Sequence, residues 1–354
     1  MTTELKNFSP LDRVKRYHQE TKHDFNQYAR SLGYMDWANQ PDPFRRFEGA
    51  PLIPLPRLTL EDIPVSPAYE ELYDQKAIPS QPLTTESLSR FFEYGLSITA
   101  WKEYGGNRWA LRSNPSSGNL HPTEGYLFLG QTPDLPLTPG LYHYAPKEHG
   151  LEHRCACSES EAKQLLEGFP EQSFLVGLSS IHWREAWKYG ERAFRYCQHD
   201  VGHAIGSLRI AAATLGWHMM VLEGMSDDRL STFLGLDRTD DFVQSEKEYP
   251  ELVAIIYPEE AILSPQEFPL SLDEQAIKNL TQSNWLGKAN HLSRDNPIPW
   301  EIIDDVAEAS WKAQQTQTRL SFDPALLPFP QRNEGKSDST QPSAGQIIPQ
   351  RRSA

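Results

Sequence analysis

The chain has 354 residues with 38% hydrophobic side chains, enough to bury the core of one large domain or two smaller ones. It carries 48 acidic residues against 34 Lys and Arg, which gives a formal net charge of -14. Because nonspecific nucleic-acid binding relies on a basic surface, this balance argues against nucleic acid as a partner.

The cysteines and the apolar segments bear on the cellular compartment. The three cysteines, Cys155, Cys157 and Cys197, are too few and too unevenly numbered to be typical of a disulfide framework. Residues 1–20 contain no apolar stretch that resembles a signal peptide. The longest uncharged apolar run, residues 210–222, is too short to span a bilayer as a helix. We therefore expect a cytoplasmic protein that does not bind a membrane.

Composition divides the chain into four zones. Residues 1–82 are rich in Pro, Tyr and charge with weak periodicity, so we expect an N-terminal Pro-rich extension in which PDPFRRFEGAPLIPLPRL is extended chain. Residues 83–258 alternate helix and strand patterns and are expected to form the main domain. Residues 259–320 are expected to form a helical extension, with its helix around 300–312. Residues 321–354, rich in Pro, Gln, Ser and Gly, are typical of a linker or a disordered tail.

The main domain is predicted to mix helices and strands. A helix capped by Thr85 is expected in TTESLSRFFEYGL, and a long helix with a small-residue apolar face over residues 193–215. Four short runs rich in β-branched and aromatic residues are predicted strands: GYLFLG, GLYHYAP, FLVGLSSI and ELVAIIYP. Helices that flank a mixed or antiparallel sheet make an α+β domain. The chain has no strand–GxGxxG–helix or Walker A sequence, so neither a Rossmann nucleotide site nor a P-loop is indicated.

A polar segment, RSNPSSGNLHPTE, lies just before the first of these strands. Arg112 offers a planar fork of donors for a phosphate or a carbonyl group, and Ser113, Ser116 and Ser117 add hydroxyl groups. Gly118 would permit a planar polar ligand to approach the backbone closely. The alternative is a polar loop without a ligand, because loops are commonly polar.

A cation-rich segment, HWREAWKYGERAFRY, follows the third strand. In an uninterrupted helix Arg184, Lys188, Arg192 and Arg195 would share one face, with the acidic residue Glu185 off that face. Crowded cations would attract an anion and would make Lys188 and the neighbouring tyrosine easier to deprotonate. The alternative is a solvated basic face, and a glycine within the segment would interrupt the helix.

The sequence HDVGH contains two histidines, His199 and His203, at the spacing of a zinc-binding helix, with Asp200 between them. The pattern lacks a third ligand, and Asp is one methylene shorter than the glutamate that serves as the base in HExxH sites. We therefore favour histidines that pack or cap a helix, and we predict no metal.

Several segments in order resemble a known family. RSNPSSGNLHPTEGYL resembles the R-x-x-P-S-[AS]-G-x-x-x-P-x-E segment of SagB/ThcOx-like proteins, the azoline-dehydrogenase branch of the nitroreductase superfamily. GLYHYAPKEHGLE is similar to their next hairpin, and KYGERAFRYCQHDVGHAIGSLRIAAATLGW to their Lys-Tyr segment and long helix. The N-terminal YHQETKH also fits, so the resemblance extends from about Tyr17 to Tyr257.

This resemblance implies an FMN-binding α+β fold with the flavin at the interface of two like subunits or two like halves. The residues that would hold the cofactor are Arg112, Ser113, Pro115, Ser116, Ser117, Gly118 and Arg192. Lys188 and Tyr189 match a Lys-Tyr pair associated with azoline dehydrogenation, where they would carry out general acid–base work. The implied substrate is a peptide or a small molecule, and the expected assembly is a homodimer or a pair with a second half.

Two features depart from the family pattern. The segment YDQKAIPSQPLTTE stands where the superfamily usually has arginines for the FMN phosphate, and Lys76 is its nearest cation. At the other end, IIPQRRSA resembles that same Arg-Arg-Ser opening, as if a second repeat began there. We expect Arg351 and Arg352 to reach a partner subunit, whereas the alternative is a coincidental basic tail.

Four functions follow from these patterns. The first is an FMN-dependent dehydrogenase that oxidises thiazoline or oxazoline rings in modified peptides, which the Lys188–Tyr189 pair favours. The second is a general NAD(P)H-dependent nitro or quinone reductase. The third is a degenerate, non-catalytic half-protein, and the last is a zinc hydrolase built on His199 and His203.

Overall fold

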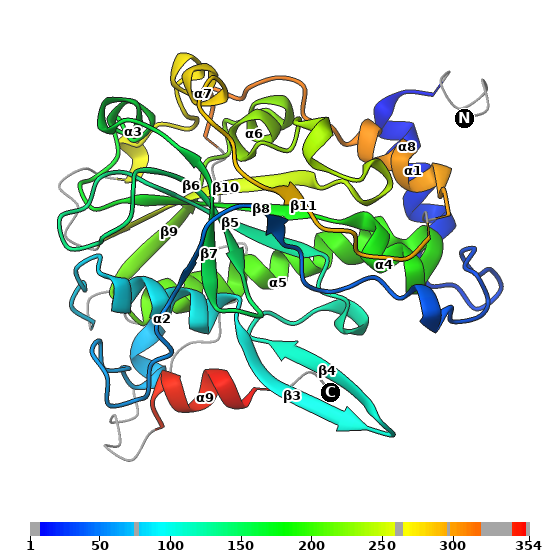
Figure 1. Cartoon of the computed structure of the whole chain (residues 1–354). Coiled ribbons are helices and arrows are strands. Elements are labelled where there is room, and N and C mark those ends of the chain that lie inside the picture. Colours follow the sequence, from blue (N-terminus) through cyan, green and yellow to red (C-terminus); the bar gives the residue numbers. More distant parts are fainter. Residues whose placement is uncertain (1–7, 74–77, 259–264, 296–297, 320–341, 352–354) are drawn as a thin grey trace.

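A seven-stranded sheet lies at the centre of the computed structural model, which describes residues 8–73, 78–258, 265–295, 298–319 and 342–351 (Figure 1). Every neighbouring pair of its strands is antiparallel. In spatial order the strands are β2 (Leu52–Pro54), β7 (Gly150–Ala156), β6 (Gly140–Ala145), β5 (Thr123–Leu129), β8 (Phe174–Ser180), β10 (Tyr249–Pro258) and β9 (Trp217–Val221). The four predicted strands are β5, β6, β8 and β10, and the predicted α+β class is confirmed with an antiparallel sheet.

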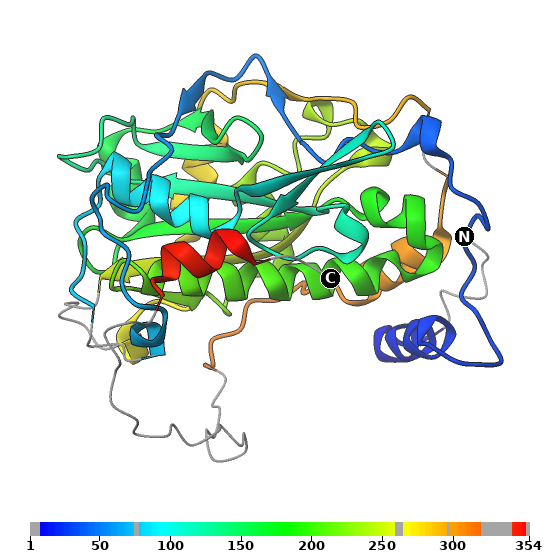
Figure 2. The same ribbon diagram turned by 90° about the horizontal axis from the view of Figure 1, so that it is seen from below.

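Two helices, α2 (Thr85–Gly95) and α5 (Ala193–Ala213), cover one face of the sheet (Figures 1 and 2). Their apolar side chains, such as Phe91 on α2 and Leu208 on α5, are fully buried against the sheet. The predicted cap of α2 is displaced by one residue, because Thr84 rather than Thr85 accepts the hydrogen bond that caps the helix.

Three shorter helices, α3 (Glu159–Leu165), α6 (Asp227–Leu234) and α7 (Glu274–Thr281), cover the opposite face. Phe233 of α6 and Phe128 of β5 pack with their ring centroids 5.6 Å apart in this second core. The fold is therefore a sheet between two helical layers, with α5 as the longest helix.

The N-terminal zone contains a helix that its weak periodicity did not predict. Helix α1 (Pro10–Thr21) begins at Ser9, whose side chain accepts from the Asp12 amide, and Pro10 suits the first turn because it has no N–H to satisfy. This helix packs against α8 (Glu301–Ala309), which lies within the segment predicted to be helical.

Smaller elements surround the sheet. Strands β3 (Ile98–Tyr104) and β4 (Asn107–Arg112) form a hairpin, and β1 (Phe47–Glu48) pairs with β11 (Lys288–Ala289). Helix α4 (His182–Tyr189) follows β8. Short 3₁₀ helices occur at Trp37–Asn39, Tyr69–Tyr73, Ser117–Asn119, Gly190–Arg192, Thr239–Asp241, Gln244–Glu246 and Pro265–Glu267.

The C-terminal segment, where a linker or a disordered tail was expected from residue 321, contains a helix in its described part. Residues 320–341 lie outside the described residues, but α9 (Ala344–Gln350) is a helix capped by Ser343 that packs against α2 and β3 (Figure 2). Within the described chain, no helix has the length and apolar character needed to cross a bilayer.

Candidate functional site

The serine-rich turn and the end of α4 lie directly against each other. Gly118 has a φ of 57°, a left-handed conformation that glycine adopts at little cost. A Cβ atom at this position would lie 2.6 Å from the Tyr189 hydroxyl oxygen and 3.0 Å from Lys188 Nζ. The two segments that the sequence singled out therefore meet at one point, and that contact requires a residue without a side chain.

Asp200 of α5 holds this turn in place. Ser116 Oγ donates to one carboxylate oxygen at 2.7 Å, and Ser117 donates from both its amide and its hydroxyl to the other at 2.9 Å. The carboxyl group is buried, and burial raises the pKa of Asp200 against the opposing effect of these donors. The aspartate of HDVGH thus anchors the turn, a role that the sequence pattern did not indicate.

The two histidines of HDVGH lie on α5 and are exposed to solvent. His203 Nδ1 is 3.9 Å from Asp200 Oδ1, beyond hydrogen-bond distance. Among the described residues, no three His, Cys, Asp or Glu side chains group closely enough to hold a metal ion. Since Asp200 is fully engaged by the serine turn, the zinc alternative gains no support from this geometry.

The predicted cationic face does not exist, because the helix ends at Tyr189. Gly190 has a φ of 53°, and a Cβ there would lie 2.4 Å from the Arg30 carbonyl oxygen, so the chain turns sharply before α5 begins. Each arginine instead has its own partners. Arg184 donates to Glu124, to His121 O and to Asp42 O. Arg192 contacts His23 and Lys22 O, whereas Arg195 contacts His18 O and Thr21.

The expected activation of Tyr189 by cations is therefore wrong. Burial raises the pKa of Tyr189 to about 12, with smaller contributions from nearby acidic groups. The phenol stays protonated near neutral pH and can act as a hydrogen-bond donor. Lys188 Nζ lies 5.4 Å from the centre of the Tyr189 ring, so the pair forms a compact unit at the end of α4.

Glu185 lies three and four residues before Lys188 and Tyr189 on α4, which places the three side chains on one face of the helix. Its carboxyl group is buried, and neither oxygen has a hydrogen-bond partner among the described residues. Glu185 was expected to lie off the predicted face of Arg184, Lys188, Arg192 and Arg195, a face that assumed a helix continuing beyond Tyr189. The i, i+3 spacing to Lys188 was the signal that could have identified it.

The side chains before the turn have partners inside the protein. Arg112, at the end of β4, is buried and donates to Pro43 O at 2.5 Å, and burial lowers its pKa to about 10. Ser113 Oγ donates to Glu93 O at 2.9 Å. Asn114 differs, since its side-chain oxygen is buried and has no hydrogen-bond partner in the described chain.

Arg351 reaches the same segment from the C-terminal end of α9. Its guanidinium group donates to Ser113 O at 2.8 Å and to Arg112 O at 3.2 Å. Arg351 was expected to reach a partner subunit, but here it contacts its own chain, and Arg352 lies outside the described residues. A cation therefore lies at the start of the serine-rich segment.

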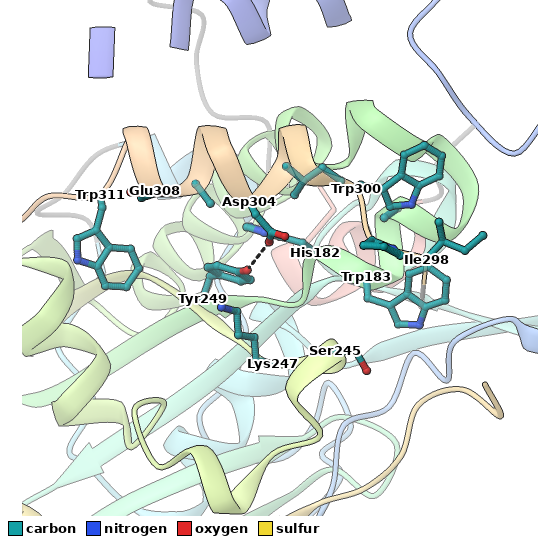
Figure 3. A pocket seen from close by; sticks show the side chains of 14 residues that line it. His182, Trp183, Ser245, Lys247, Tyr249, Ile298, Trp300, Asp304, Glu308 and Trp311 are labelled. Carbon is teal, nitrogen blue, oxygen red and sulfur yellow. Dashed lines mark hydrogen bonds between the residues drawn. The ribbon is translucent and has the colours of Figure 1, made fainter. Parts of the chain in front are cut away.

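A cavity of about 640 Å³ lies beside the first turn of α4, between β10 and α8 (Figure 3). His182 stacks on Tyr249 with ring centroids 4.0 Å apart, and the Tyr249 hydroxyl donates to Asp304 at 3.1 Å. Neither ring nitrogen of His182 has a partner among the described residues, and burial lowers the pKa of His182 to about 3. None of the predicted site residues lines this cavity.

Comparison with known proteins agrees with this fold. Residues 79–245 match the model of the nitroreductase family. A protein of Methanocaldococcus jannaschii, provisionally named nitroreductase MJ1384, is 24% identical over 180 residues, which cover 49% of this chain and 80% of that protein. The range that matches the family model, residues 79–245, includes the serine-rich turn, α4 and α5.

Solved structures share the architecture at low identity. A protein of Anabaena variabilis, provisionally described as a nitroreductase, superposes with a TM-score of 0.55 at 23% identity over 81% of this chain. This chain spans 56% of that protein's length, so it corresponds to about half of it. The E. coli microcin synthetase McbBCD complex gives a TM-score of 0.40 at 16% identity over 73% of this chain and 97% of that chain, too low to bear on function. Residues 79–245 thus match the nitroreductase family model, and the chain has a nitroreductase fold.

Proposed function

We propose that this protein is an FMN-dependent oxidoreductase that dehydrogenates thiazoline or oxazoline rings in modified peptides, as the SagB/ThcOx-like proteins it resembles do. The observation that carries the proposal is the contact of Gly118 with Tyr189 and Lys188, inside the nitroreductase-family domain. The contact puts an amine and a phenol beside the serine-rich turn.

The residues around the turn fit the polar groups of FMN. Asn114 offers a buried amide oxygen that has no partner in the described chain. Arg351 places a guanidinium group near the segment, where it would attract a phosphate. When bound, FMN would supply a two-electron acceptor.

Not all of the predicted cofactor ligands are equally placed for that role. The hydroxyl groups of Ser116 and Ser117 donate to Asp200, and Arg192 is engaged by the segment after α1. We therefore propose that Arg112, Pro115 and these two serines shape the turn, and that the backbone of the turn faces the cofactor.

Lys188 and Tyr189 would handle the proton of the reaction. Oxidation of an azoline to an azole removes one hydride and one proton from the ring. Lys188 Nζ would accept the proton, and Tyr189, whose pKa of about 12 keeps it protonated, would donate a hydrogen bond that orients the ring. Both roles require the substrate to lie beside the end of α4.

Two other functions have specific support. The provisional name of the Methanocaldococcus jannaschii protein favours a general NAD(P)H-dependent nitro or quinone reductase. The internal partner of the Ser116 and Ser117 hydroxyl groups favours a non-catalytic half-protein, because those donors are already used. In either case we propose a homodimer or a paired second half as the assembly.

Reconstitution separates the three possibilities. The purified chain is incubated with FMN, desalted, and its visible spectrum is recorded; it is then mixed without oxygen with a thiazoline-containing peptide or with NADPH. Bleaching of bound flavin by the peptide, with loss of two hydrogens from it by mass spectrometry, supports the azoline dehydrogenase. Bleaching by NADPH alone favours the reductase, and failure to retain flavin favours the non-catalytic protein.

A further inference from the structure

Two buried carboxyl groups lie at the interface of α4 and α5, and their surroundings differ. Asp200 accepts hydrogen bonds from the Ser116 hydroxyl and from the amide and hydroxyl of Ser117. Glu185 is fully buried and accepts none from the described chain. The charge of Asp200 acts on Glu185 and opposes its ionisation.

This difference decides which group holds a proton. A buried carboxylate without donors is strongly destabilised and takes up a proton instead, whereas a carboxylate with three donors keeps its charge. Two like charges in one buried region also disfavour each other. Glu185 is therefore the member of the pair that is neutral, and burial together with the Asp200 charge raises its pKa well above the ordinary value.

The other groups that face Glu185 do not provide a full counter-charge. On its own helix these are Lys188, which favours ionisation, and the Tyr189 phenol. On α5 they are Asp200 and the thiol of Cys197, and burial raises the pKa of that thiol well above its ordinary range. Lys188 is partly exposed, so water screens its charge from the buried carboxyl group.

We propose that Glu185 is a positioning residue that stays a neutral carboxylic acid at neutral pH and so leaves the Lys188 amine without a buried counter-ion. An ionised Glu185 on the same helical face would instead be a buried counter-ion that attracts Lys188 Nζ. The consequence for catalysis rests on the proposed function of Lys188 as a base, but the protonation state of Glu185 does not.

Infrared spectroscopy tests the protonation state directly, on the chain without added cofactor. The difference spectrum between the wild type and Glu185→Gln should contain the carbonyl band of a protonated carboxyl group at about pH 7, because the reference pKa of Glu is about 4.3. Glu191→Gln is the matched control: Glu191 lies in the next turn and pairs with Arg30 at 3.0 Å, so its removal should not change that band. Absence of the band from the wild type overturns the proposal.

A second measurement reports on Lys188 itself. The rate of acetylation of Lys188 by acetic anhydride is compared between the wild type and Glu185→Gln, with the exposed Lys102 as internal reference in the same digest. A neutral Glu185 predicts rates that agree within about threefold, because glutamine mimics the protonated acid. A rise of about tenfold or more would show that a counter-ion had been removed, and would overturn the proposal.

Two provisions keep the test independent of folding and of flavin chemistry. If Glu185→Gln does not fold, the wild type labelled with ¹³C at glutamate carboxyl groups is titrated by NMR, and a glutamate resonance that remains protonated at about pH 7 is the expected result. Its absence overturns the proposal. Since neither measurement requires FMN or substrate, a chain that fails to bind flavin would contradict the proposed function and leave this test intact.

Discussion

Gly118 and Tyr189 approach so closely that a Cβ atom on the glycine would lie 2.6 Å from the tyrosine hydroxyl oxygen. We expect Gly118→Ala to displace Tyr189 and Lys188 and to strain the left-handed backbone, lowering the free energy of unfolding by about 1–2 kcal/mol. Chemical denaturation measures the change. Gly202→Ala on α5, where an added Cβ meets nothing within 4 Å, is the control and should be neutral or stabilising. If both variants lost the same unfolding free energy, the contact with Tyr189 would not contribute to stability.

Asp200→Asn should loosen the serine turn. The variant keeps the shape of the side chain but loses the charge that receives the donors of Ser116 and Ser117. Hydrogen bonds to a charged group contribute about 1.5–3 kcal/mol each when they are intact, so we expect a loss of about 2–4 kcal/mol in unfolding free energy. Amide hydrogen exchange should become faster at Ser117 in particular. Unchanged exchange at Ser117 would contradict the anchoring role, and Asp237→Asn, remote from the turn, serves as the control.

Lys188→Ala should separate cofactor binding from chemistry. A proton-accepting side chain contributes about 10²–10⁴-fold to the rate, so we expect substrate-driven flavin reduction to fall by that factor while bound FMN is retained. Stopped-flow absorbance measures the reduction, and the visible spectrum measures the flavin. Lys102→Ala on the hairpin is the matched control. Unchanged turnover in Lys188→Ala would remove this lysine from the mechanism.

His182 should make the fold sensitive to acid. Its pKa in the folded chain is about 3, below the reference value of about 6.5 for the unfolded chain, so the unfolded state binds more protons between these values. Stability is therefore present above about pH 6.5 and is lost as the pH falls towards 3, by about 2 kcal/mol at pH 5. His182→Phe, which can still stack on Tyr249, should reduce this dependence in thermal melts at pH 7 and pH 5. The exposed His199→Phe is the control, and an identical acid dependence in His182→Phe would contradict the assignment.

The local patterns in the sequence predicted much of the sheet and the long helix. Strands β5 and β8 are short runs of β-branched and aromatic residues, and α5 repeats its apolar residues at three and four positions. Helix α1 was missed because its sequence is mostly polar, and it depends on packing against α8 rather than on its own pattern.

The residues of the site could be predicted only in part from the sequence. The serine-rich turn and the Lys188–Tyr189 pair could be named, because hydroxyl groups, a glycine and a cation are visible as residue types. The arginines could not be placed correctly, since Gly190 ends the helix and each guanidinium group finds a partner far away in the chain. Their grouping on one face depended on a helix that does not continue.

The sequence by itself determined the elements and the residue types of the site, because helix and strand periodicity and side-chain chemistry are local properties. Only the tertiary structure decided that Asp200 holds the turn, that Glu185 is buried without a donor, and that Gly118 touches Tyr189. These relations join residues up to 84 positions apart, as between Ser116 and Asp200. Burial and charge at such contacts depend on which faces of the helices meet, and that is settled by packing of the whole chain.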